Sequence, residues 1–218
     1  MEFTFDTEHP VAIPFDKTKL DGLLHIPKNV RGIVLFAHGS GSSRLSTRNQ
    51  HVAAVLQKAK IATLLFDLLT PEEEALDVNT GIYRFDIGFL AERLSTATHW
   101  VLHHPVLKTL PIGYFGASTG GGAALVAAAR LAAYIKAVVS RGGRPDMAEQ
   151  SISYVEAPTL LIVGGLDEAV IKMNESALQQ LHCVKELKII PGASHLFEEP
   201  GKLDEVSRQA KDWFEKYL

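Results

Sequence analysis

The pentapeptide Gly116-Ala117-Ser118-Thr119-Gly120 follows the apolar run Pro111–Phe115 and opens a stretch of small and apolar residues. A Gly-x-Ser-x-Gly sequence between a strand and a helix is typical of a sharp turn that strains its serine and lifts the hydroxyl above a sheet. Gly116 and Gly120 suit this turn, because side chains there would collide with the neighbouring strand and helix. The alternative is a glycine-rich turn in which Ser118 caps the helix. The strand-to-helix context favours a nucleophilic serine.

Short apolar runs rich in Val, Ile and Leu recur on both sides of this turn and predict strands. The first two alternate and lie close together, which favours an antiparallel pair at a sheet edge. The later runs are continuously apolar, as expected for strands covered on both faces. The eight predicted strands are Val11–Phe15, Leu20–Ile26, Gly32–Ala37, Ile61–Phe66, Pro111–Phe115, Ile135–Val139, Thr159–Val163 and Leu187–Ile190.

Longer amphipathic stretches with helical spacing separate the later strands. Helices are predicted at Thr47–Lys58, Arg84–His103, Ser118–Ala132, Ile171–Leu181 and Leu203–Tyr217. This alternation predicts an α/β fold, with a mostly parallel, twisted sheet of about eight strands and helices on both faces.

The organisation of the chain points to one unit. No internal repeat or linker-like change of composition interrupts the 218 residues, so residues 1–218 are expected to form a single domain. The connection from Ser140 to Pro158 is too short to hold a large lid domain. The acidic segment Pro71–Asp77 is expected to be a surface loop or short helix with solvated charges, and whether it folds over the site stays open.

Composition excludes several classes of protein. A hydrophobic fraction of 46% and a charged fraction of 22% are those of a globular protein. A net charge of −3 without a basic cluster argues against binding of nucleic acid. Residues 1–6 lack the features of a secretory signal, and no apolar run is long enough to cross a membrane. Cys183, the single cysteine, fits a reducing compartment. We therefore expect a cytoplasmic protein without a membrane partner, either monomeric or homodimeric.

A serine hydroxyl needs a base that removes its proton. Of the nine histidines, His195 stands out, because its segment Pro191–Phe197 follows the last predicted strand. Ligands of parallel sheets bind at loops that follow the carboxyl ends of strands. His195 is therefore the candidate general base for Ser118.

A carboxylate between the serine and the histidine in the chain would orient such a base. Asp167 fits, because it follows the penultimate predicted strand, whereas its neighbour Glu168 is expected to point elsewhere. The alternative role for Asp167 is a helix cap or a turn. The order Ser…Asp…His favours the catalytic role. Two other acids follow predicted strands and serve as fallback candidates: Asp67 and Asp146.

Acyl transfer also requires donors for an oxyanion. The backbone N–H of Thr119, directly after the serine, is one candidate. The segment His38-Gly39-Ser40-Gly41-Ser42-Ser43 follows a predicted strand, and its glycines allow close backbone approach. We expect the N–H of Ser40 to be the second donor, and His38 to brace this loop. A phosphate-binding loop is excluded here, because the sequence lacks Gly-x-x-x-x-Gly-Lys.

These residues together resemble the α/β-hydrolase family, and the resemblance covers nearly the whole chain. The small size, the absent lid and the segment Gly192–Phe197 look most like the dienelactone-hydrolase-like branch. Dienelactone hydrolases proper use a cysteine nucleophile, where this chain has Ser118. The segments His38–Arg44 and Ser140–Asp146 also resemble hydrolase domains fused to phosphoribosyltransferases. The resemblance implies a lidless hydrolase that uses no metal and no organic cofactor.

Arginines near the predicted site are the clue to the substrate. Arg44, Arg84, Arg141 and Arg144 are candidate substrate-binding residues for an anionic group, and Arg48 lies close to the first of them. The alternative is that these arginines cap helices or form ion pairs with nearby acids such as Asp86, Asp146 or Glu149.

The function predicted from the sequence is hydrolysis of small carboxylic esters, with a small-molecule ester as the substrate. Ser118 would be the nucleophile of an acyl-enzyme intermediate, His195 the base and Asp167 the residue that orients it. Lactone or thioester hydrolysis and acyl transfer use the same groups and remain alternatives. A non-catalytic binding protein has no need of the three matched groups. A haloalkane dehalogenase would require a carboxylate in place of Ser118.

Overall fold

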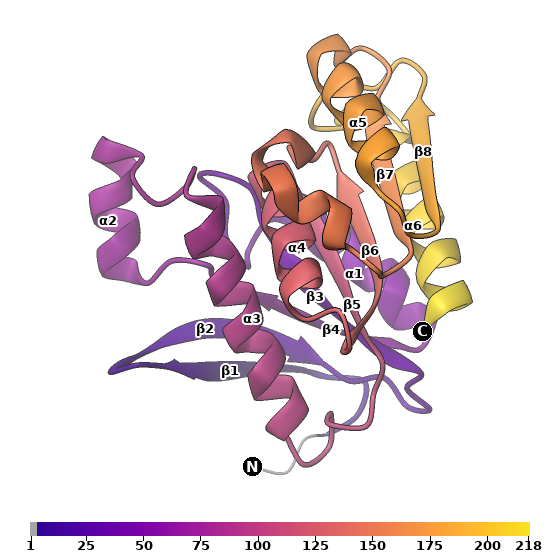
Figure 1. The fold of residues 1–218 in the computed structure, drawn as a ribbon. Helices are drawn as coiled ribbons and strands as arrows, with labels where there is room; N and C mark the ends of the chain where they lie inside the picture. The colour runs from indigo at the N-terminus through magenta and orange to yellow at the C-terminus, as the bar shows by residue number, and fades with distance from the viewer. Residues whose placement is uncertain (1–3) are drawn as a thin grey trace.

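A computed structural model describes residues 4–218, so three of the six residues inspected for a secretory signal lie outside it. Eight strands form one twisted sheet in the order β1-β2-β4-β3-β5-β6-β7-β8 (Figure 1). Strands β1 and β2 pair antiparallel, as does β2 with β4, and all other neighbours are parallel. The strands are β1 (Glu8–Phe15), β2 (Thr18–His25), β3 (Gly32–Ala37), β4 (Ile61–Phe66), β5 (Ile112–Ala117), β6 (Ile135–Arg141), β7 (Thr159–Gly164) and β8 (Lys185–Ile190). This sheet confirms the predicted α/β architecture.

Helices cover both faces of the sheet because its central strands are apolar on both sides. Every residue of β3, β4, β5 and β7 is buried. Helices α1 (Thr47–Lys58) and α6 (Lys202–Tyr217) pack on one face. The opposite face is covered by α3 (Ile87–His103), α4 (Thr119–Arg130), the 3₁₀ helix η1 (Pro145–Tyr154) and α5 (Glu168–Gln180). Between β6 and β7 only η1 is present, so no large lid domain occurs there.

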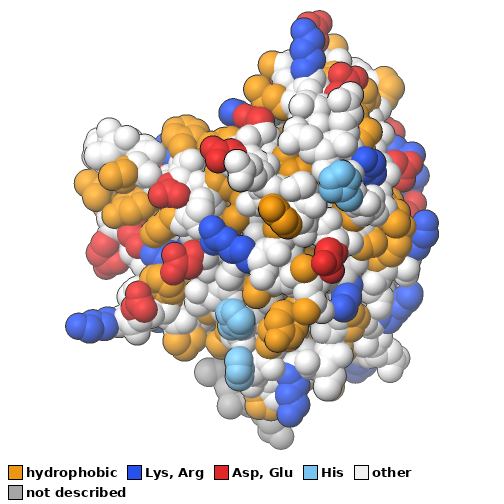
Figure 2. Space-filling view, in the orientation of Figure 1, with side chains coloured by type: hydrophobic (Ala, Val, Ile, Leu, Met, Phe, Trp, Pro, Cys, Tyr) orange, Lys and Arg blue, Asp and Glu red, His pale blue; other side chains and the backbone are white. Residues whose placement is uncertain are grey.

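The acidic segment forms a helix, α2 (Pro71–Thr80), that stands apart from the sheet (Figure 1). Thr70 and Glu73 form a capping box, and Pro71 occupies the first helical turn, which are strong helix-start signals. Asp77 is the only residue of α2 that is buried. On the face seen in Figure 2, hydrophobic side chains gather over α2, and positive and negative side chains are interspersed elsewhere.

Several predicted boundaries differ from the structure. The helix predicted from Arg84 begins at Ile87, because Asp86 accepts a hydrogen bond from the amide of Phe89 and caps it. The sixth strand continues through Arg141, which was expected to follow it. Strands β1 and β8 begin earlier than predicted, in polar residues at the edges of the sheet.

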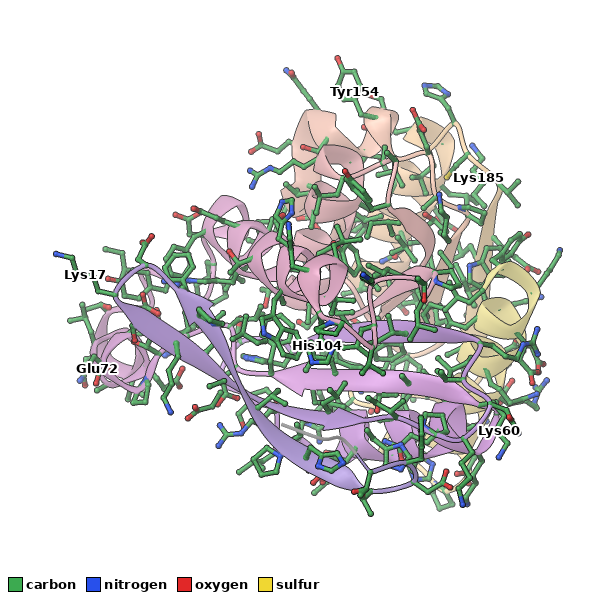
Figure 3. The ribbon with its side chains drawn as sticks, turned by 90° about the horizontal axis from the view of Figure 1, so that it is seen from below. Lys17, Lys60, Glu72, His104, Tyr154 and Lys185 are labelled. Carbon is green, nitrogen blue, oxygen red and sulfur yellow. The ribbon has the colours of Figure 1, made fainter. Side chains whose placement is uncertain are left out.

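The parallel strands all end at one edge of the sheet, and the candidate site lies there. Figure 3 shows both ends of the strands. Lys60 and Lys185 mark the ends where β4 and β8 begin, and Glu72 of α2 lies at the opposite end. Among residues 4–218, no helix is long and apolar enough to cross a membrane. The cytoplasmic location stays a prediction.

Candidate active site

Ser118 stands between β5 and α4 with a backbone conformation of φ 52° and ψ −121°. A non-glycine residue rarely adopts such a conformation, and strain of this kind marks functional positions. Gly120 is required beside it, because a β-carbon there would lie 2.1 Å from the carbonyl oxygen of Ala37. Similarly, a β-carbon on Gly116 would lie 2.4 Å from the carbonyl oxygen of Gly120. The Ser118 hydroxyl makes no capping hydrogen bond to α4, so it is not a helix cap.

His195 and Asp167 meet Ser118 from the loops after β8 and β7. The Ser118 hydroxyl lies 3.3 Å from Nε2 of His195. The other ring nitrogen, Nδ1, lies 2.5 Å from Oδ2 of Asp167. Because the carboxylate only accepts, Nδ1 carries the proton and Nε2 is left to accept from the serine. The three side chains therefore form one hydrogen-bonded line, although they come from positions far apart in the sequence.

The competing acids are occupied elsewhere. Asp67 accepts from the backbone amide of Arg44 at 2.7 Å and pairs with its guanidinium. Asp146 forms a two-point ion pair with Arg144, at 2.9 and 2.7 Å. Asp167 precedes α5 but makes no capping hydrogen bond through its side chain. Of the candidate acids, Asp167 is the one whose carboxylate the structure brings to His195.

The two residues that carry the candidate oxyanion donors contact each other through their side chains. The hydroxyls of Ser40 and Thr119 are 3.1 Å apart, which joins the loop after β3 to the start of α4. Thr119 is the first residue of α4, so its N–H has no acceptor within the helix. Gly39 allows the approach, because a β-carbon there would lie 3.1 Å from the β-carbon of Ser118. His38 is buried, and its ring nitrogens contact the carbonyl oxygen of Gly39 and the N–H of Leu68.

Of the four arginines proposed for substrate, three are engaged by carboxylates. Arg44 pairs with Asp67 and Arg144 with Asp146. Arg84 pairs with the buried Asp77 of α2, at 2.5 Å from Nε to Oδ2. Burial acts to raise the pKa of Asp77, but hydrogen bonds from Tyr83 and Arg84 outweigh it and hold that pKa below its usual value. Arg141 alone makes no ion pair within residues 4–218.

Sequence reasoning missed a residue that supports His195. Both carboxylate oxygens of Glu199 lie 3.1 Å from the backbone N–H of Ser194, so Glu199 closes the loop that presents the imidazole. Hydrogen bonds from Ser194 hold the pKa of Glu199 below its usual value. The only signal was an acid four positions after a candidate base, which is too common to be specific. Within residues 4–218, no three His, Cys, Asp or Glu side chains are arranged to hold a metal ion.

Comparisons with known proteins agree with this architecture. The model of the dienelactone hydrolase family matches residues 20–218. A crystal structure of dienelactone hydrolase from Anabaena variabilis is 60% identical, covers 97% of this chain and 98% of its own, and superposes with a TM-score of 0.96. A lidless serine hydrolase from Xanthomonas campestris has the same fold at 20% identity, with a TM-score of 0.76 over 100% of this chain and 98% of its own.

A curated relative from Mycobacterium tuberculosis, provisionally named a phosphoribosyl transferase, is 56% identical over 197 residues. The match covers 90% of this chain and 44% of the relative. This chain therefore spans less than half the length of the curated relative that it matches.

Proposed function

Since the chain belongs to the dienelactone hydrolase family, we propose that it is a serine hydrolase of short-chain carboxylic esters. The observation that carries the proposal is the hydrogen-bonded line from Ser118 through His195 to Asp167, with the serine at a strained turn. A serine of this kind is activated when a neighbouring base takes its proton. Ser118 replaces the cysteine expected of a dienelactone hydrolase proper, which favours ordinary esters over dienelactone.

The first half of the reaction forms an acyl-enzyme. Nε2 of His195 takes the hydroxyl proton as Oγ of Ser118 attacks the carbonyl carbon of the ester. The carbonyl oxygen becomes an oxyanion, which the N–H groups of Thr119 and Ser40 stabilise. The bond to the alcohol oxygen then breaks, and His195 gives its proton to the leaving alcohol. Asp167 keeps the imidazole oriented and stabilises its charged form.

The second half releases the acid. His195 removes a proton from a water molecule, whose oxygen attacks the acyl carbon and forms a second oxyanion. The bond to Oγ breaks, the carboxylic acid leaves, and the proton returns to Ser118. No metal or organic cofactor takes part in these steps. Only η1 lies between β6 and β7, and this short segment favours an open site and short acyl groups.

A rate panel on p-nitrophenyl esters from acetate to palmitate tests the proposal, with Ser118→Ala alongside. We expect hydrolysis of acetate and butyrate, little of palmitate, and none in the variant, whose circular dichroism spectrum should match the wild type. Equal rates in the variant and the wild type would overturn the mechanism.

A fluorophosphonate probe separates the remaining alternatives. Labelling of Ser118 without turnover of any ester would replace the ester proposal with lactone or thioester hydrolysis or acyl transfer. Absence of both labelling and turnover would favour a non-catalytic binding protein.

A further inference from the structure

We propose that Arg141 forms a binding site for a carboxylate group next to the catalytic triad. The proposal deepens the proposed ester hydrolysis, because the carboxylate would be a second acidic group of the substrate or a free acid of the same chemistry. It rests on a buried cation that the fold leaves without a partner.

The Arg141 side chain is buried, with 6% of the residue exposed. Its Nε and Nη1 atoms are inaccessible to solvent and have no hydrogen-bond partner among residues 4–218. Nη2 makes no hydrogen bond either, and it is the one guanidinium nitrogen that solvent reaches. A buried charge without a partner is strongly unfavourable in a folded protein. A ligand that supplies the missing negative charge would remove this penalty.

Arg48 adds a second positive charge, close enough to act on the Arg141 guanidinium. It lies in the first turn of α1, its Nε is also buried without a partner, and its Nη1 contacts Glu198 at 3.2 Å. Burial, with a smaller contribution from the Arg48 charge, lowers the pKa of Arg141 to about 10. The Glu198 side chain is 63% exposed, so solvent screens the carboxylate that pairs with Arg48. Arg48 therefore has one exposed acid as its partner, and Arg141 has none among residues 4–218.

The cluster adjoins the proposed triad. Arg141 ends β6, where its carbonyl oxygen accepts from the backbone N–H of Ser118 at 3.1 Å. A β-carbon on the next residue, Gly142, would lie 3.4 Å from Cε1 of the His195 ring. Strand alternation turns Arg141 away from Ser140, which faces α4, and toward the α1 side of the sheet. An anion bound there would lie at the edge of the reaction centre.

Arg93 shows what a structural buried arginine looks like in this chain. It is 2% exposed, and its Nε and Nη1 also lack hydrogen-bond partners within the described part of the chain. Its Nη2, however, pairs with Glu73, and its guanidinium lies over the rings of Phe15 and Phe89, at 3.6 and 4.4 Å from their centroids. Arg44, Arg84 and Arg144 likewise have carboxylate partners. Among residues 4–218, Arg141 has none of these compensations, so ion pairing within this part of the chain does not explain its burial.

The free edges of the guanidinium define the ligand. A guanidinium can donate two parallel hydrogen bonds to one ligand, either from Nε and Nη2 or from Nη1 and Nη2. Nη2 belongs to both pairs, so a ligand that reaches Nη2 can accept two parallel hydrogen bonds. A carboxylate is planar, carries two acceptor oxygens and matches either edge. The small exposed area of Arg141 favours this planar group over a bulkier tetrahedral anion.

Thermal unfolding tests the site without using activity. Sodium acetate is exchanged for sodium chloride at constant total salt for the wild type, Arg141→Met and the matched buried control Arg93→Met. We expect acetate to raise the Tm of the wild type and of Arg93→Met saturably, and to leave the Tm of Arg141→Met unchanged.

Without acetate, Arg141→Met should unfold at or above the wild-type Tm, because the substitution removes an unpaired charge, whereas Arg93→Met should unfold at a lower temperature. An equal acetate response in the wild type and Arg141→Met would overturn the proposal, as would a loss of Tm in Arg141→Met as large as in Arg93→Met.

Kinetics then identify the source of the carboxylate. The p-nitrophenyl monoester of glutaric acid is compared with p-nitrophenyl pentanoate, its uncharged counterpart. A substrate-borne carboxylate predicts that the ratio of the two kcat/KM values falls about tenfold or more in Arg141→Met and is unchanged in Arg93→Met. An unchanged ratio, with the acetate response lost, assigns the site to a free carboxylate. If the wild type hydrolyses neither ester, the proposed ester hydrolysis fails, and the acetate response still decides whether the anion site exists.

Discussion

The backbone N–H of Leu68 donates a hydrogen bond to Nε2 of His38, at 3.0 Å. Because Nε2 accepts, Nδ1 carries the proton and donates to the carbonyl oxygen of Gly39, at 3.0 Å. The neutral imidazole thus ties the segment after β4 to the loop that carries Ser40. Burial lowers the pKa of His38, which keeps the ring neutral in the folded protein.

This arrangement makes stability depend on pH. Below the ordinary value of 6.5, the unfolded chain protonates His38 while the folded protein does not, so stability falls as pH falls. We expect the free energy of unfolding to drop by up to about 1.4 kcal/mol per pH unit for this group. Urea unfolding at several pH values would measure it, with His38→Gln as the comparison, because glutamine keeps an acceptor for Leu68. The pKa values of His25 and His104 are also lowered. The contribution of His38 is therefore the difference in the free energy of unfolding between the wild type and His38→Gln. Parallel pH profiles would contradict the prediction.

Gly120→Ala should disrupt the turn that presents Ser118. The added carbon would lie 2.1 Å from the Ala37 carbonyl oxygen and 2.6 Å from that of His38, and backbone atoms cannot easily yield. We expect a loss of about 3 kcal/mol or more in the free energy of unfolding. Gly88→Ala is the control, since its nearest neighbour would lie 3.4 Å away and alanine favours its helix by about 1 kcal/mol. Similar unfolding curves for the two variants would show that the short distance between Gly120 and the Ala37 carbonyl oxygen does not exclude a side chain.

Glu199 is expected to act as a positioning residue for His195. Glu199→Ala removes both contacts to the Ser194 N–H and should lower kcat on p-nitrophenyl acetate on the order of tenfold, because small misplacements of a catalytic group are costly. Glu199→Gln keeps an acceptor oxygen and should recover most of the activity. Equal losses in both variants would point to a role of the charge itself. Glu205→Gln, on α6, serves as the neutral control.

The fold and the line of Ser118, Asp167 and His195 could be predicted because each depends on local signals. Continuous apolar runs predict buried parallel strands, and the loops after such strands converge at one edge of the sheet. The turn at Ser118 is recognisable because two glycines flank the serine at a fixed spacing. The contact that requires Gly120 nevertheless comes from Ala37, which is distant in the sequence. The helix α2 also had a local signal in Thr70 and Glu73, but its acidic run resembles an ordinary solvated segment.

The Arg144–Asp146 ion pair agrees with the alternative weighed from the sequence, because its partners are two positions apart. Ion pairs between distant segments could not be predicted. Arg44 and Asp67 are 23 positions apart, and nothing in either segment identifies the partner. The strand predicted from the apolar run Ile135–Val139 ends before the polar residues Ser140 and Arg141. Both are nevertheless buried, at the covered end of β6, and only the structure distinguishes the unpaired arginine from the paired ones.

Asp167→Asn is the sharpest test of the proposed triad. Asparagine can present an amide N–H to Nδ1 of His195, which would place the imidazole proton on Nε2 and remove the acceptor for Ser118. We expect kcat on p-nitrophenyl acetate to fall by about four orders of magnitude. Stability should change little, because the Asp167 side chain caps no helix. The neighbouring Glu168→Gln is a matched control, since Glu168 is exposed and should leave kcat unchanged. Comparable losses in both variants would indicate a general electrostatic effect, and an active Asp167→Asn would mean that His195 is oriented without this carboxylate.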